Sequence, residues 1–283
     1  MAFRGSRNGS SVRRRMLARR LRLLREAAGL TLADAAPALD WSVSKLSRIE
    51  IAQVGVDVHG VRSMLDLYGA ADQWTELVEL AREANRRGWY RAYGVGDHSY
   101  IGYETEAVQV QEYAAGFVPG LLQVAEYAKA LFLATPVRRS SAELEREIAV
   151  RMIRQRRLTA AEHELRLVAI VAEGVLRNPV GGPAVLRAQL EHLLIAAELD
   201  TVCLQVLPTA VGAHAALASG FYVLSFGDIG EPDMAYVEHA LGAAHLEKEA
   251  EVSLARLKFD QLRSLALAPA ESLVLVEGVL AES

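Results

Sequence analysis

The sequence has a single cysteine, Cys203, among 283 residues. This excludes an internal disulfide framework and any metal site built from several cysteines. It also has no run of about 18 or more apolar residues, so we expect no transmembrane helix. The N-terminal residues are rich in Arg and Ser and lack the apolar core of a signal peptide, which predicts a cytoplasmic protein. Aromatic residues make up only 6% of a chain that is 52% hydrophobic, which fits one large globular domain or two ordinary ones.

Motifs of catalytic and metal chemistry are also scarce. The seven histidines include no His-Glu-x-x-His pair, and His239 and His245 are more simply read as surface or core residues than as metal ligands. Ser42-x-x-Lys45 has the spacing of the nucleophile pair of penicillin-binding enzymes, but the partner motifs of that class are missing. We therefore expect no enzyme activity, no cofactor and no metal ion, and we keep an enzyme only as the least supported hypothesis.

Charge is unevenly distributed along the chain. Residues 1–50 hold 11 Lys and Arg against 4 Asp and Glu, a balance of +7, whereas the remainder carries −11 and the whole chain −4. A basic N-terminal part is the electrostatic pattern of a protein that binds a polyanion. Residues 1–12, rich in Gly, Ser and Arg, are predicted to be a disordered basic arm, with a disordered tail of no consequence as the alternative.

Helical periodicity begins directly after this arm. Residues 13–28 predict a first helix, which Gly29 is placed to end. Its apolar stripe consists of Leu17, Leu21, Leu24 and Ala28. Thr31 and Asp34 resemble a capping box that begins a second helix, and Pro37 should bend or shorten that helix near its C-terminal end.

The next stretch, residues 42–50, predicts a third helix with two different faces. At about 100° per residue, Ser42, Leu46 and Ile49 fall on one side. The other side carries Val43, Ser44, Ser47 and Arg48. These side chains suit the DNA major groove, because Arg binds guanine, Ser donates or accepts, and Val contacts the thymine methyl group. Two short helices, a turn at Asp40-Trp41 and this third helix indicate a helix-turn-helix.

The span Leu17 to Glu50 resembles the Cro/C1 repressor type of helix-turn-helix, also called the XRE type. The matching features are Arg-x-x-Arg-Glu-x-x-Gly-Leu-Thr, then Leu39, then Ser-x-Ser-x-Leu-Ser-Arg-Ile-Glu. The sequence departs from the family at Leu32, where a Gln usually contacts DNA, at Ala35, usually Leu, and at Pro37.

This resemblance implies that Val43, Ser44 and Ser47 face bases and that Lys45 and Arg48 face bases or phosphates. The full set of predicted DNA-contacting residues is Arg19, Arg22, Thr31, Ser42, Val43, Ser44, Lys45, Ser47 and Arg48. The family has two further helices, which residues 56–67 and 73–87 fit. We therefore predict an N-terminal all-α, five-helix domain over residues 13–87, followed by a linker over residues 88–99.

From residue 100 the chain resembles the large second domain, DUF5753, found on helix-turn-helix regulators of actinomycetes and sometimes described as antitoxin-like. The matching stretches begin at Tyr100, Phe117, Leu176, Gln189, Leu204, Gly212, Phe259 and Leu267. The sequence departs from this domain at Ala215-Ala216, usually Pro-Gly, and at Val124, usually Thr. These departures matter if that surface holds a ligand.

The residues of this second part predict an α+β domain with a small mixed sheet covered by helices on one face. The predicted strands are residues 165–172, 202–207, 220–226 and 234–238. The predicted helices are residues 143–158, 183–199, 247–266 and 270–280.

Three features of the second domain remain open from sequence. The apolar run 117–122 is either core or part of an interface. The arginines of residues 151–157 form either a solvated, salt-paired helix face or a partner surface. The stretch 178–183 is more simply a turn that starts a helix than an anion site on free backbone amides.

These patterns together predict a sequence-specific DNA-binding transcriptional regulator located at the nucleoid. We expect a homodimer, because a single helix-turn-helix buries little surface on double-stranded DNA. Residues 100–283 are expected to mediate dimerisation and to sense a small molecule or a small partner protein, which the resemblance implies is acidic and encoded nearby. The alternative is an antitoxin-like module that mainly binds a small partner protein and uses DNA binding for autoregulation.

Overall fold

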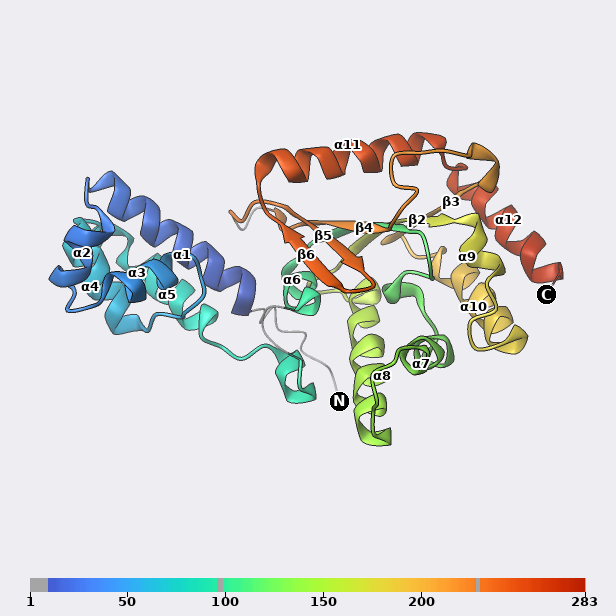
Figure 1. The fold of residues 1–283 in the computed structure, drawn as a ribbon, viewed down its shortest axis with the longest axis horizontal. Helices are drawn as coiled ribbons and strands as arrows, with labels where there is room; N and C mark the ends of the chain where they lie inside the picture. Colours follow the sequence, from blue (N-terminus) through green and yellow to red (C-terminus); the bar gives the residue numbers. More distant parts are fainter. Residues whose placement is uncertain (1–9, 96–98, 228–229, 283) are drawn as a thin grey trace. The chain divides into compact units, whose positions relative to one another are not determined.

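The computed structural model describes residues 10–95, 99–227 and 230–282 (Figure 1). Most of the predicted arm, residues 1–9, lies outside the described residues, whereas residues 10–12 already belong to the first helix. The chain divides into two compact units. The first, the helical unit, consists of Met1–Glu106 with Asp228–Glu231, and the second, the sheet unit, of Ala107–Gly227 with Pro232–Ser283.

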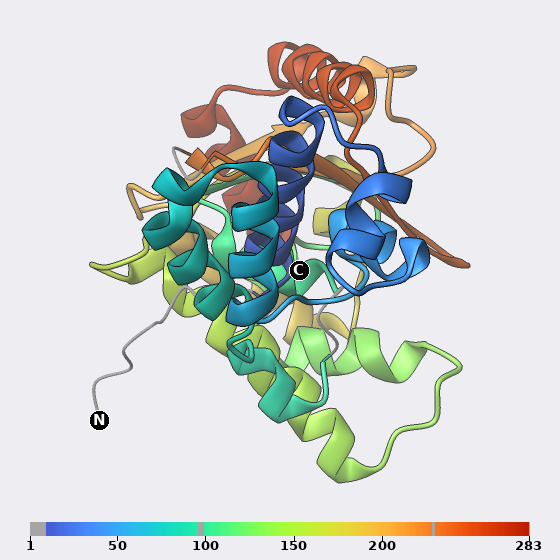
Figure 2. The same ribbon diagram turned by 90° about the vertical axis from the view of Figure 1, so that its left-hand side faces the viewer.

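The helical unit contains the five predicted helices in a single bundle. They are α1 (Ser10–Ala27), α2 (Leu32–Ala38), α3 (Val43–Glu50), α4 (Val58–Tyr68) and α5 (Trp74–Ala84), followed by α6 (Tyr100–Glu106). Short 3₁₀ turns lie at Ala71–Gln73 and Trp89–Tyr93. Within this unit, α1 runs between the α2–α3 pair and the α4–α5 pair (Figure 2). Leu17, Leu21, Leu46 and Leu65 form its buried core, as their helical spacing predicts.

The ends of these helices follow from identifiable local signals. Thr31 and Asp34 form a reciprocal capping box at the start of α2. The Ser42 hydroxyl accepts from the backbone N–H of Lys45 and begins α3. Gly29 lies in the left-handed region at φ +71° after α1, where a residue without Cβ is unstrained. The helix α2 ends one residue after Pro37, the shortening that proline predicts.

The sheet unit is built on six strands in the order β3-β2-β1-β4-β5-β6. They are β1 (Gln109–Ala114), β2 (Arg166–Ala172), β3 (Val202–Leu207), β4 (Phe221–Ser225), β5 (Met234–His239) and β6 (Gly242–Leu246). The pairs β3-β2 and β2-β1 are parallel, and the pairs from β1 to β6 are antiparallel, so the predicted mixed sheet is confirmed. The central strand β1 and the edge strand β6 were not predicted.

Helices cover both faces of this sheet rather than one. They are α7 (Ala125–Ala134), α8 (Ser141–Gln155), α9 (Glu173–Arg177), α10 (Pro183–Ala196), α11 (Glu249–Leu265) and α12 (Pro269–Glu282), with 3₁₀ turns at Gly120–Leu122, Arg156–Thr159 and Thr209–Val211. Figure 1 shows α11 on one side of the sheet and α7 and α8 on the other. The single-face prediction is therefore wrong. Side chains alternate between the two faces of a strand, and on β1 both Glu112 and Tyr113, which point to opposite faces, are buried.

The two faces of the sheet differ in chemistry because side chains alternate along each strand. On one face Tyr113, Phe221 and Val223 pack with Phe259 of α11 in an apolar core. On the other face the register places Glu112 opposite Tyr222 and Tyr222 opposite Tyr236. This second face therefore carries polar groups across three neighbouring strands.

Burial also decides two features that the sequence left open. Of the apolar run 117–122, Val118, Leu121 and Leu122 are buried, so the run is mainly core. Of the arginines around the end of α8, Arg154 is buried and Arg151 and Arg157 are half-buried, whereas Arg156 is exposed. Arg151 donates to the side chain of Gln123 at 3.0 Å, and Arg157 donates to the carbonyl of Ala107 at 2.7 Å. Arg151 and Arg157 therefore bind within their own unit and are not part of a fully solvated helix face.

Across the described residues, no single helix has both the length and the apolar composition to cross a membrane; α11 and α12 pass that test only as a pair bent by 68°.

Candidate nucleic-acid interface

The helix α3 has one buried side and one open side. Leu46 and Ile49 are 0% and 2% exposed and hold the helix to the core. Val43 is 45% exposed, Ser44 and Arg48 are also exposed, and Ser47 is half-buried. Val43, Ser44 and Arg48 therefore lie on an open surface of the helical unit, and Ser47 lies at its partly covered edge.

A buried ion pair fixes the C-terminal end of α3 against α1. Arg25 and Glu50 are each 7% exposed, and they form two hydrogen bonds, of 2.7 and 2.9 Å, in a fork geometry. A third bond of 2.6 Å joins Arg25 to the carbonyl of Leu30. The hydrogen bond to Glu50 raises the pKa of Arg25, and burial, followed by the charge of Glu50, raises the pKa of nearby Tyr68 to about 12. Sequence reasoning missed this pair, since its members lie 25 positions apart.

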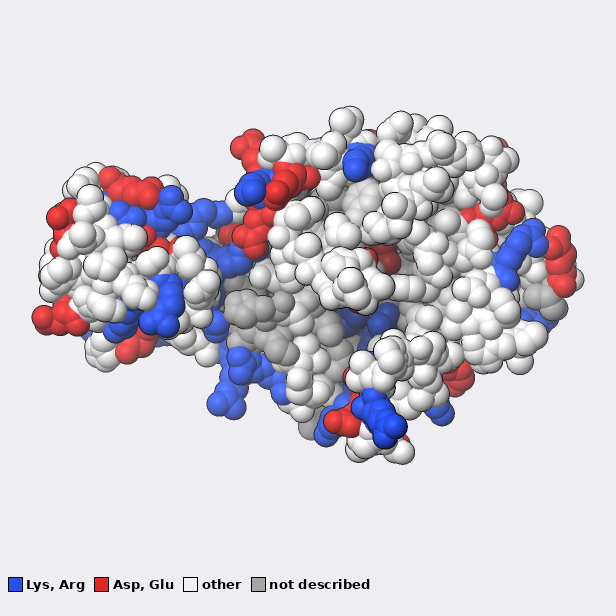
Figure 3. All heavy atoms as spheres, in the orientation of Figure 1, with Lys and Arg blue, Asp and Glu red and all other residues white. Residues whose placement is uncertain are grey.

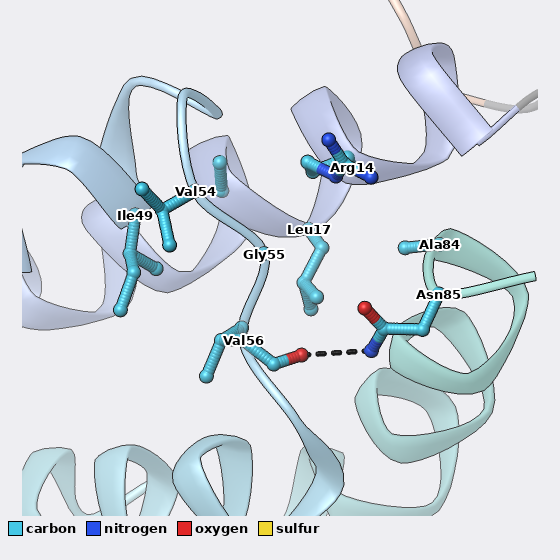
Figure 4. A pocket seen from close by; sticks show the side chains of 9 residues that line it. Arg14, Leu17, Ile49, Val54, Gly55, Val56, Ala84 and Asn85 are labelled. Carbon is cyan, nitrogen blue, oxygen red and sulfur yellow. Dashed lines mark hydrogen bonds between the residues drawn. The ribbon is translucent and has the colours of Figure 1, made fainter. Parts of the chain in front are cut away.

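The chain after α3 is held from the other side by Asn85. The side-chain amide of Asn85 donates to the carbonyl of Val56 at 2.9 Å (Figure 4). It also donates to the carbonyl of Ala81 at 2.9 Å. The cavity between Leu17, Gly55 and Asn85 has a volume of only about 10 Å³, the space of a single water. This region is too small for a ligand, and its contacts join the segment after α3 to α1 and to the end of α5.

Two basic side chains of α3 are already positioned by near neighbours. The ammonium of Lys45 lies 4.0 Å from the ring centroid of Trp41, a cation–π contact. The Nε of Arg48 donates to the carbonyl of Ser44 at 3.3 Å, which directs the guanidinium along its own helix. Basic atoms are visible over α1 and α3 on the helical unit in Figure 3.

The three predicted contacts outside the third helix are engaged in internal interactions. The Thr31 hydroxyl binds the Asp34 carboxylate at 2.6 Å and lowers the pKa of that carboxyl group. Exposed Arg22 pairs with Glu26 at 2.8 Å. Half-buried Arg19 pairs with Glu231 of the same unit at 3.3 Å. Six of the nine predicted residues thus gather at α3, and DNA contact by all nine stays a prediction.

A second concave feature lies in the sheet unit and was not anticipated from sequence. A cavity of about 320 Å³ is lined by Glu112, Tyr222 and Glu238 among others. The signal was hidden because Glu112 belongs to β1, whose polar sequence Gln-Val-Gln-Glu-Tyr-Ala does not resemble a central strand. Within the described part of the chain, no group of three or more His, Cys, Asp or Glu side chains is placed to hold a metal ion.

Comparison with known protein families matches residues 98–278 to a domain of unknown function, DUF5753. The chain belongs to the DUF5753 family. Residues 16–78 match a helix-turn-helix domain, so the predicted pairing of a helix-turn-helix with DUF5753 is confirmed. No curated protein and no solved structure matches this DUF5753 protein.

Only one of the two family matches indicates a function. The helix-turn-helix match extends from α1 into α5 and indicates a DNA-binding regulator. The DUF5753 match covers the sheet unit but assigns it no function. What the DUF5753 domain binds must therefore be argued from its own residues.

Proposed function

We propose that this protein is a sequence-specific transcriptional regulator that reads the DNA major groove with α3. The observation that carries the proposal is the two-sided geometry of α3. Leu46, Ile49 and the Arg25–Glu50 pair fix its inner side, and Val43, Ser44 and Arg48 are exposed on its outer side. A rigid helix that presents its side chains before binding loses less conformational entropy on DNA.

The proposed roles follow from the local geometry of each side chain. Arg48 binds guanine through its two-pronged guanidinium, Ser44 and Ser47 bond to base edges, and Val43 contacts a thymine methyl group. Lys45, held over Trp41, contacts a phosphate. Thr31 and Ser42 lie at helix N-termini, where phosphates are favoured. Arg19 and Arg22 exchange their present carboxylate partners for phosphates.

The protein is proposed to act as a homodimer on paired half-sites at the nucleoid in the cytoplasm. The exposed part of α3 is short, and one such helix reaches only a few base pairs. The DUF5753 domain is proposed to mediate dimerisation and to sense a small molecule or a small partner protein. Two footprints centred about one helical turn apart, or a multiple of that distance, are the expected pattern on the operator.

The direct test is fluorescence anisotropy with a labelled duplex from the region upstream of the protein's own gene. We expect binding that survives physiological salt and an excess of shuffled duplex. Arg48→Ala should weaken binding by about 1–3 kcal/mol and relax the preference at one base position. Lys45→Ala should weaken binding to all sequences alike and reduce the salt dependence by about one phosphate contact.

Arg82→Ala is the matched control, because Arg82 is an exposed arginine of the same unit that pairs with Glu79 on α5. It should leave the operator affinity unchanged. Equal affinity for operator and shuffled duplex, or no loss on Arg48→Ala in a folded protein, would show that α3 does not read sequence.

A further inference from the structure

The helix α11 carries apolar side chains on its outer side as well as on its inner side. Its inner side is formed by buried residues: Val252, Ala255, Phe259 and Leu262. On the outer side, Leu254 and Leu257 are 52% and 67% exposed. Figure 1 shows α11 as the outer layer on its side of the sheet. These two leucines therefore point away from the core of their own unit.

The exposed residues of this outer side repeat with the spacing of a two-helix contact. We call Ala250, Leu254, Leu257 and Gln261 the outer stripe; all four are exposed and follow one another at intervals of four, three and four residues. At about 100° per residue they lie within an arc of about 60°. Positions a and d of a coiled coil have this spacing, so the stripe is suited to a second helix that lies alongside α11.

Two half-buried residues of opposite charge lie beside the outer stripe. Glu251 and Lys258 are seven residues apart, so they take the same position of the heptad, position e. Glu251 pairs with exposed Lys248 at 3.5 Å, a contact that costs little to exchange. No carboxylate pairs with Lys258 in the part of the chain that the structure describes.

The order of these charges selects one orientation for a second copy of α11. In an antiparallel helix pair, e positions face e positions, so Glu251 of each copy lies beside Lys258 of the other. In a parallel pair, Lys258 instead faces Ser253, at position g, and no opposite charges meet. Charge complementarity therefore favours the antiparallel, two-fold arrangement.

We propose that α11 pairs antiparallel with the α11 of a second copy of this chain. The two-fold axis passes between Leu254 and Leu257, so that Leu254 of each copy packs on Leu257 of the other, and Ala250 lies opposite Gln261. Such an interface is isologous and closes as a dimer. The inference rests on the dimerisation proposed above for the DUF5753 domain and names its surface, but it does not depend on how α3 reads DNA.

The first test is sedimentation velocity on the full-length protein without DNA. We expect a monomer–dimer equilibrium with a Kd on the order of 10 µM, since a contact of two heptads is small. Leu257→Glu should weaken the dimer at least about tenfold, because it places a charge in the apolar contact of both copies. Val274→Glu on α12 is the matched control, because Val274 is also 67% exposed and lies outside the stripe. It should leave the Kd unchanged.

A charge exchange tests the orientation. Glu251→Lys and Lys258→Glu should each weaken the dimer about fivefold, because like charges then meet twice across the axis. The double variant should restore the affinity of the parent, since it exchanges both members of each pair. Restoration is not expected if the single variants act through the fold of one copy. Failure of the double variant to restore affinity overturns the antiparallel pairing.

Cross-linking gives an independent readout of the same geometry. A mixture of Ala250→Cys and Gln261→Cys should form a disulfide-linked dimer under mild oxidation, and neither variant alone should exceed the parent, which contains only Cys203. A cross-link in Ala250→Cys alone overturns the proposal.

The outcomes separate this inference from the proposed function. A dimer that Leu257→Glu leaves intact overturns the role of α11, whereas the proposed homodimer then stands on another surface. A monomer at all concentrations up to about 0.5 mM also overturns the role of α11. The spacing of footprints on the operator then decides separately whether the protein pairs on DNA.

Discussion

At the scale of single residues, Glu50 links stability to the candidate DNA surface. Glu50 is the last residue of α3, and both oxygens of its carboxylate accept hydrogen bonds from Arg25 of α1. A buried ion pair adds little net stability over an apolar pair of similar size. Removal of one partner is costly, because the other charge is then left buried away from water. The pair therefore serves mainly to fix how α3 sits on α1.

Glu50→Gln should lower the free energy of unfolding of the helical unit by about 3–5 kcal/mol, because it removes the buried counter-charge of Arg25 and leaves only the more distant, exposed carboxylate of Glu26, at 3.6 Å. The three tryptophans, Trp41, Trp74 and Trp89, all belong to this unit, so tryptophan fluorescence in a urea titration reports on it alone. Glu76→Gln is the control, since Glu76 makes an exposed pair with Arg20 and should cost below about 1 kcal/mol. Equal, small effects of both variants would contradict the role given to the buried pair.

His192 on α10 gives the sheet unit a predicted pH dependence. Burial lowers its pKa below the ordinary value of 6.5. The folded protein therefore binds this proton less readily than the unfolded chain, and the contribution of His192 to stability is present above about pH 6.5 and lost as the pH falls. NMR titration of the histidine resonances should show one pKa below 6.5 that is missing in His192→Gln. The variant should also lose less stability than the parent between about pH 7.5 and pH 5, as measured by circular dichroism in urea.

At the scale of elements, local signals explain the helical unit better than the sheet. The helices α2, α3 and α4 each begin at a side chain that caps its own backbone: Thr31, Ser42 and Asp57. Each cap acts within three or four residues, so it can be read from sequence. By contrast, β1 contains Gln109, Gln111 and Glu112, and only its pairing with β2 and β4 makes it a strand.

Two glycines in open space should respond to alanine with opposite signs. Gly29 and Gly278 have no neighbouring atom within 4 Å of an added Cβ, so crowding is absent at both. Gly29 has a φ of +71° after α1, and Gly29→Ala should destabilise the helical unit by about 1 kcal/mol. Gly278 lies inside α12, and Gly278→Ala should stabilise the sheet unit by about 0.5–1 kcal/mol. Thermal unfolding by fluorescence and by circular dichroism measures the two effects, and changes of the same sign would contradict the backbone argument.

At the scale of the whole molecule, each unit has its own core. Leu17, Leu46 and Leu65 belong to the core of the helical unit, and Phe221 and Phe259 to that of the sheet unit. A separate core is the physical condition for separate unfolding. Charge is divided between the units in the same way, since the basic segment, residues 1–50, lies entirely in the helical unit.

Two separable unfolding transitions are therefore expected. Phe259→Ala should lower the stability of the sheet unit by about 3–5 kcal/mol and shift the transition seen by far-ultraviolet circular dichroism. It should leave the midpoint of the tryptophan-fluorescence transition unchanged, because no tryptophan belongs to that unit. Glu50→Gln should shift the tryptophan-fluorescence midpoint and the part of the circular-dichroism change that accompanies it, and it should leave the remaining circular-dichroism step, that of the sheet unit, in place. A shift of the fluorescence midpoint by Phe259→Ala would show that the chain unfolds as a single block.

The amino-acid sequence by itself determined the five helices, the caps of α2 and α3 and the outward set of Val43, Ser44 and Arg48, because these depend on periodicity and on contacts within a few residues. Tertiary structure alone decided which distant residues meet. It joined Arg25 to Glu50, and it brought Glu112, Tyr222 and Glu238 around one cavity. Strand partners are selected by long-range burial and register, which leave no local pattern in the chain.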